Sequence, residues 1–300
     1  VFKPPIDTLF GKMHLLEVQR GCGMGCKFCF TDSMYRPPKY QSKEILNDLL
    51  SNLLLNDRVG LIAPNILSTP LFPILLEHSE RLKIFFSSLR VDQLDDKWFE
   101  ILKNSGQESI TISIESGSEK LRTFINKRIK IEKIFNSIQK IIDNQILNIK
   151  IYFIIGLPTE DYQDIEEMIK IIKEIYAIYQ QGVKSVARIG KITIGISSFI
   201  PKPHTPFELY PMQSQEDIKN KFEKIQNSLS KLDNLVIHPE PIINSIFQTF
   251  INRAERSDLS ILIKCAEEGE KKTYRHNRSR IEELIYKHIY DNQSVPWNIV

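Results

Sequence analysis

The sequence predicts an α/β fold in which about six β/α units build a parallel sheet covered by helices, followed by a mainly helical extension. Three observations predict this fold. Strand-like and helix-like segments alternate from residue 13 to residue 200. The run 148–155 is almost continuously apolar, which favours a strand buried on both faces of a parallel sheet. After Pro211 the alternation stops and long amphipathic stretches follow.

The predicted strands are short apolar segments that end at a loop, a proline or a polar turn. They cover residues 13–19, 58–63, 82–87, 109–114, 148–155 and 191–199. The predicted helices carry apolar residues at helical spacing. They cover residues 42–55, 70–80, 95–103, 119–126, 131–143, 160–179 and 214–232, and the remainder of the chain has a helical, charged pattern.

The change of pattern divides the 300 residues into three parts. We expect a lead-in at residues 1–12, a core of β/α units at residues 13–211 and a helical extension at residues 212–300. The first residue is Val1 and not methionine, so we expect the chain to be a piece of a longer protein.

Composition excludes several classes of protein. Hydrophobic residues make up 42% and charged residues 26% of the chain, which is ordinary for a globular protein and excludes collagen-like, disordered and disulfide-scaffold chains. A net charge of +3 does not by itself indicate a nucleic-acid or membrane partner. No apolar run approaches the ~20 residues that span a bilayer, and the start lacks a signal peptide. We therefore expect no membrane partner and a cytoplasmic protein with reduced thiols.

Three of the four cysteines are crowded into one glycine-rich loop. Cys22, Cys26 and Cys29 form the pattern C-x3-C-x2-C, directly after the first predicted strand. Such crowding is poor geometry for two disulfides, so we interpret the loop as a site for a soft metal centre. Cys265 lies far away in a helical stretch, and we interpret it as a small buried hydrophobic residue.

Two kinds of metal centre fit three thiolates. Structural zinc takes four ligands, and His14 is a candidate for the fourth. A cubane iron–sulfur cluster held by three cysteines leaves one iron open for a substrate or cofactor. The glycines of the loop allow its backbone to curl around a bulky cluster.

The cysteine pattern, with the aromatic Phe28 before the last cysteine, resembles the radical S-adenosylmethionine (radical SAM) superfamily over about residues 13–210. The resemblance implies a partial (β/α)6 TIM-like barrel in which Cys22, Cys26 and Cys29 hold a [4Fe-4S] cluster and the open iron binds S-adenosylmethionine. It also implies an electron donor such as flavodoxin or ferredoxin, and reductive cleavage to a 5′-deoxyadenosyl radical for hydrogen abstraction or methyl transfer. The substrate, a small molecule or an RNA, and any further catalytic residue stay open.

Two segments resemble the parts of the superfamily that contact S-adenosylmethionine. In the stretch I-x-G-x-P-x-E, the resemblance places Gly156 and Pro158 against the adenine, and a missing Cβ at Gly156 would let the ring approach. The alternative is an ordinary strand end with a Gly-x-Pro turn. At the end of the fourth predicted strand, Ser113, Glu115 and Ser116 are implied to contact the ribose and the methionine. The alternative there is a capped helix start.

Further candidates lie after the second and third predicted strands. Arg90 is positioned to hold a carboxylate of the cofactor or of a substrate, with Lys127 and Arg128 as rivals and solvated surface charge as the alternative for all three. Many relatives carry Gly-Gly-Glu after the second strand to bind the amino group of the cofactor. Here Pro64 and Asn65 occupy that place and can offer backbone or amide oxygens instead.

The segment S-x-F-x-P-x-x-x-T-P-F begins at Ser197, another candidate for cofactor contact, and contains His204, a candidate for substrate contact. It resembles the superfamily branch that often carries an upstream cobalamin-binding domain, and its methylthiotransferase cousins. The chain lacks both the D-x-H-x-x-G cobalamin loop and cysteines for a second cluster. Cobalamin is therefore expected only through an upstream domain outside this chain.

The alternatives for function are a tRNA-modifying radical SAM enzyme that transfers a methylthio or methyl group, and a non-catalytic metal-binding scaffold. The run 271–280 is rich in Lys and Arg and contains Tyr274, as an RNA contact would. Acidic residues precede the run, which favours a solvated surface whose charge is neutralised locally.

Overall fold

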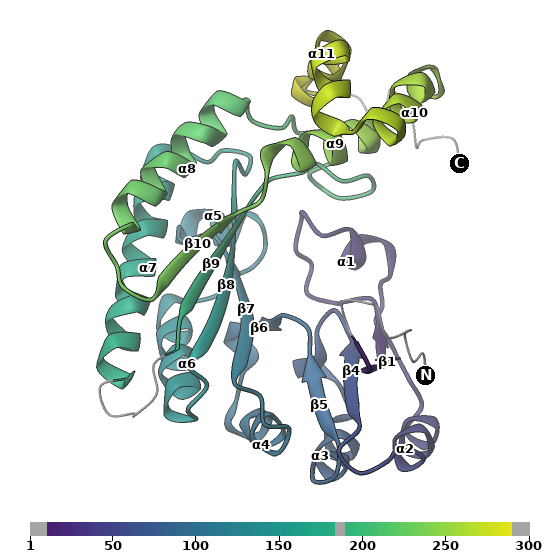
Figure 1. Cartoon of the computed structure of the whole chain (residues 1–300), viewed down its shortest axis with the longest axis vertical. Helices are drawn as coiled ribbons and strands as arrows, with labels where there is room; N and C mark the ends of the chain where they lie inside the picture. Colours follow the sequence, from purple (N-terminus) through teal and green to yellow (C-terminus); the bar gives the residue numbers. More distant parts are fainter. Residues whose placement is uncertain (1–10, 184–189, 290–300) are drawn as a thin grey trace.

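Parallel strands in two sheets form the centre of the molecule (Figure 1). The computed structural model describes residues 11–183 and 190–289. The three-stranded sheet has the order β1-β4-β5, and the five-stranded sheet has the order β10-β9-β8-β7-β6, with parallel pairing throughout both. Their strands are β1 (His14–Glu17), β4 (Arg58–Ile62), β5 (Lys83–Phe86), β6 (Leu89–Arg90), β7 (Ser109–Glu115), β8 (Asn148–Ile155), β9 (Ile192–Ser198) and β10 (Leu235–Pro239).

The two sheets form a partial barrel whose strands lie in chain order, as in a β/α barrel (Figure 1). One sheet passes into the other just after the third predicted strand. That strand corresponds to β5, which pairs with β4, and after Ser87 and Ser88 the chain continues as β6, which was not predicted and pairs with β7. The predicted α/β fold and partial barrel are confirmed, with the hydrogen-bonded ladder divided at these two serines.

Helices cover the outer faces of the sheets, and each of them was expected from its apolar spacing. They are α2 (Lys43–Ser51), α3 (Phe72–Ser79), α4 (Asp96–Asn104), α6 (Ile131–Asp143), α7 (Tyr162–Val183) and α8 (Gln215–Leu229). Neighbours pack in chain order, α2 on α3, α3 on α4, α6 on α7 and α7 on α8. Their inner faces and the outward residues of the strands share one apolar core, which includes Ile151, Ile172 and Ile194.

The apolar strand β8 is buried on one face only, so the prediction of burial on both faces is wrong. Ile149, Ile151 and Phe153 are buried against the helices, whereas the alternate residues Lys150 and Tyr152 are half-buried on the barrel side. A barrel that is only partly closed leaves its inner face accessible to solvent, and that face therefore accommodates a lysine and a tyrosine.

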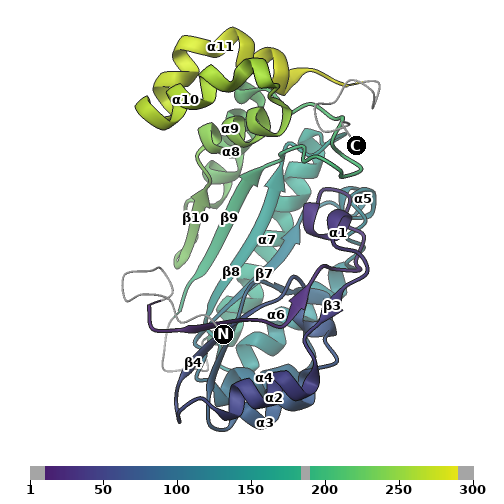
Figure 2. The same cartoon turned by 90° about the vertical axis from the view of Figure 1, so that its right-hand side faces the viewer.

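The chain after Pro211 is not wholly helical, because β10 extends the parallel sheet along β9. The helices that follow lie at one end of the strands (Figure 2). They are α9 (Ile242–Arg253), the 3-10 turn η3 (Arg256–Asp258), α10 (Leu259–Glu268) and α11 (Glu270–Tyr286), which is kinked at Asn277. These helices share a separate apolar cluster around Phe247, Phe250 and Ile281.

Short elements lie between the main strands and helices. They are β2 (Gln19–Arg20) and β3 (Lys39–Tyr40), which pair antiparallel, the helices α1 (Phe30–Met34) and α5 (Glu119–Phe124), and the 3-10 turns η1 (Ile66–Ser68) and η2 (Val91–Gln93). Within the described ranges, no helix combines the length and the apolar character needed to cross a bilayer.

Candidate functional site

The cysteine loop runs from β2 to α1, and its backbone requires glycine. Cys29 is the N-cap residue of α1, and its N–H donates to the carbonyl oxygen of Cys26 at 3.0 Å. Gly21 has a φ of +83°, and a Cβ there would overlap the backbone oxygen of Tyr35. Gly25 has a φ of +75°, and a Cβ there would lie 2.6 Å from the side-chain nitrogen of Asn126. These glycines let the chain curl tightly enough to bring three thiols into one loop.

Two polar side chains that were not predicted from the sequence hold this loop in place. The buried Asp32 accepts the N–H of Gly25 at 3.0 Å and is paired with Arg36. Asn126, which follows α5 with a φ of +58°, donates from Nδ2 to the Gly25 oxygen at 2.9 Å. The carbonyl of Ile125 also accepts the N–H of Lys27 at 3.0 Å. The loop is therefore attached both to its own helix and to the segment after β7.

Cations gather around Cys26. Arg90 extends from β6 and places Nη1 3.9 Å from the Cys26 sulfur. Its Nε and Nη2 contact the two oxygens of Asp92 at 3.0 and 3.1 Å, which orients the guanidinium. Burial raises the pKa of the Cys26 thiol to about 11, and the charges of Lys127 and Arg90 oppose that rise. Arg90 thus lies beside the cysteine loop and is already paired with a carboxylate of its own chain, and its contact with a carboxylate of the cofactor stays a prediction.

Lys127 joins two of the predicted site residues. Its Nζ lies 2.7 Å from Ser113 Oγ and 2.7 Å from Glu115 Oε1, and the side chain of Lys127 is only 4% exposed. Glu115 ends β7 with a φ of +69°, a strained conformation for a residue with a side chain, and the register of β7 against β8 shifts between Ser113 and Glu115. Its negative charge acts on Cys26, so Lys127 and Glu115 belong to the surroundings of the cysteine loop. Arg128 is exposed.

Ser116 is placed differently from its neighbours. It is fully buried, and its hydroxyl accepts the N–H of Ser118 at 3.2 Å. Ser118 in turn caps α5 by accepting the N–H of Leu121 at 3.3 Å. The hydroxyl of Ser116 therefore has a local structural role, and the capped helix start that was weighed against a cofactor role is present.

The turn after β8 lies against the cysteine loop through an apolar cluster. Leu157, Phe199 and Phe207 are buried together in this cluster, and Phe28 of the loop packs on it. Pro158 is buried within the turn. The loop and the turn are therefore brought together, and contact of Phe28 and Pro158 with the cofactor stays a prediction.

Gly156 is a glycine for a reason other than the expected one. It has a φ of +77°, and a Cβ there would point at α8, 2.5 Å from Ile218 Cδ1. Its N–H donates to Glu160 Oε1 at 2.7 Å. The expectation that the absent Cβ makes room for a flat ring is wrong, since that space is filled by Ile218. Contact of the adenine with another face of this turn stays a prediction.

The segment after β4 contains a buried polar side chain. Asn65 is buried and donates from Nδ2 to Ser68 Oγ at 3.1 Å. Its Oδ1 is buried without a hydrogen-bond donor among the described residues. A buried acceptor of this kind is suited to a ligand that brings an N–H group. The amide oxygen expected at this position is therefore present, next to the half-exposed end of β4 at Ile62.

Ser197 lines a cavity of about 710 Å³ between the ends of β8, β9 and β10 and helix α8. Its wall is largely apolar, with Ile155, Ile196 and Phe222 among the lining residues. His204, in the loop after β9, has a φ of +60°, and its backbone N–H donates to Glu208 at 2.6 Å. Contact of Ser197 with the cofactor stays a prediction.

His14 does not join the cysteines. It begins β1, and its Nε2 lies 3.5 Å from Asp57, which precedes β4, so both residues are at the amino ends of their strands. Within residues 11–183 and 190–289, no three His, Cys, Asp or Glu side chains converge as ligands of one metal ion would. Cys265 lies in α10 and packs on the C-terminal apolar cluster, but it is only partly buried and not fully buried as expected.

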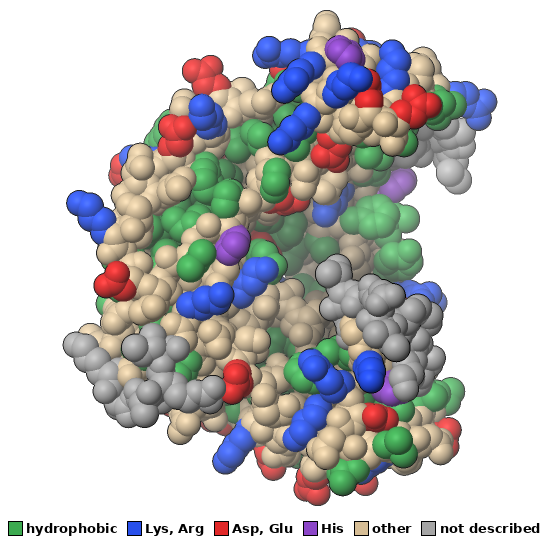
Figure 3. Space-filling model, in the orientation of Figure 1, with side chains coloured by type: hydrophobic (Ala, Val, Ile, Leu, Met, Phe, Trp, Pro, Cys, Tyr) green, Lys and Arg blue, Asp and Glu red, His purple; other side chains and the backbone are tan. Residues whose placement is uncertain are grey.

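The basic run lies on α11, where Lys and Arg side chains gather at the top of the molecule (Figure 3). Several of them are paired. Lys272 lies 3.0 Å from Glu268, Arg278 lies 2.9 Å from Glu282, and Arg280 lies 2.8 Å from Asp258. The hydroxyl of Tyr274 donates to Glu282 at 2.6 Å, so this ring is held within the helix cluster. Local neutralisation, the favoured interpretation of the run, agrees with these pairs.

The donor set fits an iron–sulfur cluster. Three thiols come from one glycine-shaped loop, and Arg90 and Lys127 supply positive charge beside Cys26. In a cubane each thiolate binds a different iron, so the three sulfurs stand farther apart than the ligands of one ion do. Cations near the loop favour thiolates over thiols, and thiolates are the form that binds iron.

Known proteins match this chain along most of its length. The Radical SAM superfamily matches residues 16–172. An uncharacterized protein of Methanocaldococcus jannaschii is 31% identical over 266 residues, which cover 86% of this chain and 56% of that protein. The tRNA-2-methylthio-N(6)-dimethylallyladenosine synthase of Clostridium botulinum is 23% identical over 252 residues, which cover 77% of this chain and 52% of that enzyme. The chain thus spans about half the length of the curated relatives it matches.

Solved structures are more distant. SuiB of Streptococcus suis, bound to S-adenosylmethionine, matches with a TM-score of 0.46 and 13% identity over 76% of this chain and 50% of SuiB. The cobalamin-dependent enzyme OxsB matches with a TM-score of 0.46 and 16% identity over 90% of this chain and 46% of OxsB. The sequence match at residues 16–172 covers more than half of the chain and includes all three loop cysteines. The chain therefore belongs to the radical SAM superfamily.

Proposed function

We propose that this chain is the catalytic core of a radical SAM enzyme that binds a [4Fe-4S] cluster through Cys22, Cys26 and Cys29. The observation that carries the proposal is the cysteine loop with Arg90 3.9 Å from Cys26. Membership of the superfamily supports it independently. When bound, the cluster supplies the electron that cleaves S-adenosylmethionine to methionine and a 5′-deoxyadenosyl radical, which abstracts hydrogen from a substrate or takes part in methyl transfer.

The residues of the chain hold and orient the cofactor. Arg90 and Lys127 stabilise negative charge next to Cys26, and the oriented guanidinium is suited to a carboxylate. Asn65 Oδ1 offers a buried acceptor for an amino group. Glu115, held by Lys127, offers a carboxylate for ribose hydroxyls. The turn after β8, packed on Phe28, supplies an apolar surface for adenine. Desolvation by these walls strengthens each polar contact.

The test is anaerobic reconstitution with iron and sulfide, followed by incubation with S-adenosylmethionine and dithionite. We expect a brown protein with about four irons per chain that releases 5′-deoxyadenosine. A colourless, zinc-loaded protein would refute the proposal. A loaded protein that releases neither 5′-deoxyadenosine nor S-adenosylhomocysteine would point to the alternative, a non-catalytic metal-binding scaffold.

A second candidate is a tRNA-modifying enzyme that transfers a methylthio or methyl group. The observation that favours it is the similarity to a tRNA methylthiotransferase over 77% of this chain. Cys265 is the one cysteine outside the loop and lies on the outer helices, so a second cluster would require ligands from outside this chain. Incubation of the loaded protein with tRNA and detection of modified nucleosides by mass spectrometry tests this candidate.

We also propose a cytoplasmic location and a reduced flavodoxin or ferredoxin as electron donor. Support for the location comes from the three thiols, which must stay reduced to bind iron. Replacement of dithionite by a reduced flavodoxin in the cleavage assay tests the donor. Cleavage of S-adenosylmethionine with reduced flavodoxin would support flavodoxin as the donor. Cleavage with dithionite but not with reduced flavodoxin would exclude it.

A further inference from the structure

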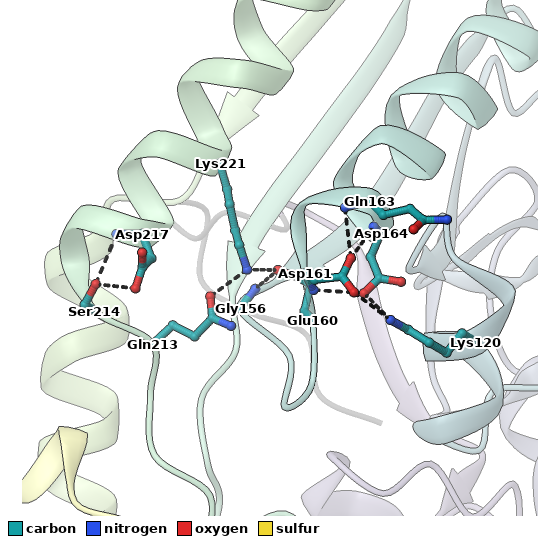
Figure 4. A network of polar contacts seen from close by, with 10 residues as sticks. All are labelled: Lys120, Gly156, Glu160, Asp161, Gln163, Asp164, Gln213, Ser214, Asp217 and Lys221. Atoms are coloured by element: carbon teal, nitrogen blue, oxygen red, sulfur yellow. Dashed lines mark hydrogen bonds and ion pairs between the residues drawn. The ribbon is translucent and has the colours of Figure 1, made fainter.

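A buried polar network holds the turn after β8 to helix α8 (Figure 4). Its centre is Glu160, whose side chain is fully buried. Glu160 Oε1 accepts the N–H of Gly156 at 2.7 Å and the ammonium of Lys221 at 2.7 Å. The same ammonium donates to Gln213 Oε1 at 2.7 Å. Three segments of the chain, the turn, the lead into α8 and α8 itself, therefore meet at one nitrogen atom.

The carboxylate depends on these donors for its orientation. Glu160 Oε2 is buried and has no hydrogen-bond donor among the described residues. Burial raises the pKa of Glu160, and the charge of Lys221 and the N–H of Gly156 oppose that rise. Lys221 is thus the positive group that favours the ionised carboxylate, and an ionised carboxylate is the stronger acceptor for the Gly156 N–H.

Such a pair is costly in a protein interior. Two charges lose their hydration, and an apolar pair of the same volume is often as stable or more stable. Packing of α8 on the sheet is already provided by Ile218, Ile225 and Leu229, which are buried in the main core. What the ion pair adds is a fixed geometry for the backbone at Gly156, a residue held at a φ of +77°.

We propose that Lys221 is a positioning residue for the S-adenosylmethionine site, and that it acts through Glu160 on the backbone of the turn at residues 156–158. This inference rests on the proposed function, in which the turn contacts the adenine. Lys221 touches no part of the cysteine loop among the hydrogen bonds and ion pairs of the described residues, so its effect is on the cofactor and not on iron. Neither Lys221 nor Gln213 stands out in the sequence.

The experiment compares Lys221→Met with Lys224→Met. Methionine keeps much of the length of lysine and removes its charge and donors. Lys224 lies one turn further along α8 and pairs with Glu166 at 2.8 Å on the surface, so it is a matched control. A third variant, Glu160→Gln with Lys221→Met, removes both charges and keeps an acceptor for the Gly156 N–H. Four quantities are measured on each cluster-loaded protein. They are the iron content, the thermal midpoint, the dissociation constant for S-adenosylmethionine from equilibrium dialysis, and the amide hydrogen exchange of residues 155–160.

We expect Lys221→Met to weaken S-adenosylmethionine binding by about tenfold or more, as for a lost buried charge contact. Exchange at residues 155–160 should accelerate while exchange in β4 and the iron content stay as in the wild type. Lys224→Met should bind within twofold of the wild type. If Lys221→Met does not fold, the double variant Glu160→Gln with Lys221→Met is measured instead, because its neutral pair avoids an unpaired buried charge. We expect the same weakening of S-adenosylmethionine binding in that variant.

Three results would overturn the inference. They are unchanged affinity in a folded Lys221 variant, equal weakening by Lys224→Met, and a fall in thermal midpoint with exchange accelerated throughout the chain. The last result would show a general structural role. If the wild-type protein itself holds the cluster but binds no S-adenosylmethionine, the proposed function fails as well, whereas a binding wild type with an unaffected variant refutes only the role of Lys221.

Discussion

Arg90 Nη1 lies 3.9 Å from the sulfur of Cys26, a residue 64 positions away in the chain. The contact exists because β6 continues the strand direction of β5 into the second sheet and ends beside the cysteine loop. A cation at this distance favours the more negative state of an adjacent redox centre.

Arg90→Met is therefore expected to make the reduction potential of the bound cluster more negative. Asp92→Asn is expected to shift it the other way, since it removes the carboxylate that partly neutralises Arg90. A redox titration followed by electron paramagnetic resonance measures both. Shifts of the same sign in the two variants would contradict a charge effect.

Each single substitution Cys22→Ala, Cys26→Ala and Cys29→Ala is expected to abolish stable cluster binding. Two thiolates from this loop leave two of the irons without a protein ligand, and His14 lies at the other end of its strand. Cys265→Ala, on α10, should keep the iron content of the wild type. Iron per chain after reconstitution decides the matter, and normal iron in any loop variant would disprove the assignment.

Lys127→Met is expected to reduce both stability and cofactor binding. The substitution leaves Glu115 without its 2.7 Å partner in a largely buried position, which costs about 3 kcal/mol of the free energy of unfolding. Arg128→Met, at the exposed neighbouring residue, is the control and should change stability by less than about 0.5 kcal/mol. Denaturant unfolding and S-adenosylmethionine affinity are the measurements. Equal effects of the two substitutions would argue against a role for the buried pair.

Gly156→Ala is expected to destabilise the protein by about 1–3 kcal/mol, because it forces a side-chain residue into a left-handed conformation. The added Cβ also lies 2.5 Å from Ile218 Cδ1. Shortening that neighbour by Ile218→Ala should relieve the overlap but not the strain, so the double variant should be more stable than the sum of the single effects predicts. Full additivity in thermal unfolding would show that the two residues do not meet.

Asp258 provides a pH-dependent contribution to stability. A hydrogen bond from Arg280 holds the pKa of Asp258 below its ordinary value of 3.8. Its contribution to stability is therefore complete above that ordinary value and is lost as the pH falls through the lower, folded pKa. Asp258→Asn should lower the thermal midpoint at pH 7, and its effect should become smaller as the pH falls below 3.8 toward the folded pKa. Asp96→Asn, at a side chain that is 83% exposed, should show little effect at either pH.

The sequence predicted the barrel well, because apolar strands and amphipathic helices follow periods that a single chain displays. It did not predict β10, since residues 235–239 are few, largely exposed and end with a proline, and their pairing with β9 is a tertiary contact. The cysteine loop was recognisable from spacing alone. Asp32 and Asn126 were not, because their roles come from backbone groups that only the fold brings near.

Gly156 and Lys127 show in the same way that the role of a single residue depends on contacts that only the fold creates. Gly156 was expected to make room for a ligand, and the space is instead occupied by Ile218 from a helix 62 residues later. Lys127 was one of three candidate cations, and its burial beside Glu115 separates it from the exposed Arg128. Sequence patterns indicate which residue types can serve a site, and packing decides which of them do.

Among residues 11–183 and 190–289, β10 pairs only with β9, so no described strand lies along its other edge, which has a consequence for association between molecules. Glu240 donates its N–H to Ile196 of β9 at 2.8 Å, and because successive amides of a strand alternate in direction, residue 239 faces the opposite, open edge. That residue is Pro239, which has no N–H to offer, and Pro241 follows closely. A strand from another molecule would therefore meet few backbone N–H donors along the carboxyl end of this edge. A barrel that stays unclosed exposes an edge that would otherwise recruit strands from other molecules, and the two prolines protect it from such edge-to-edge aggregation.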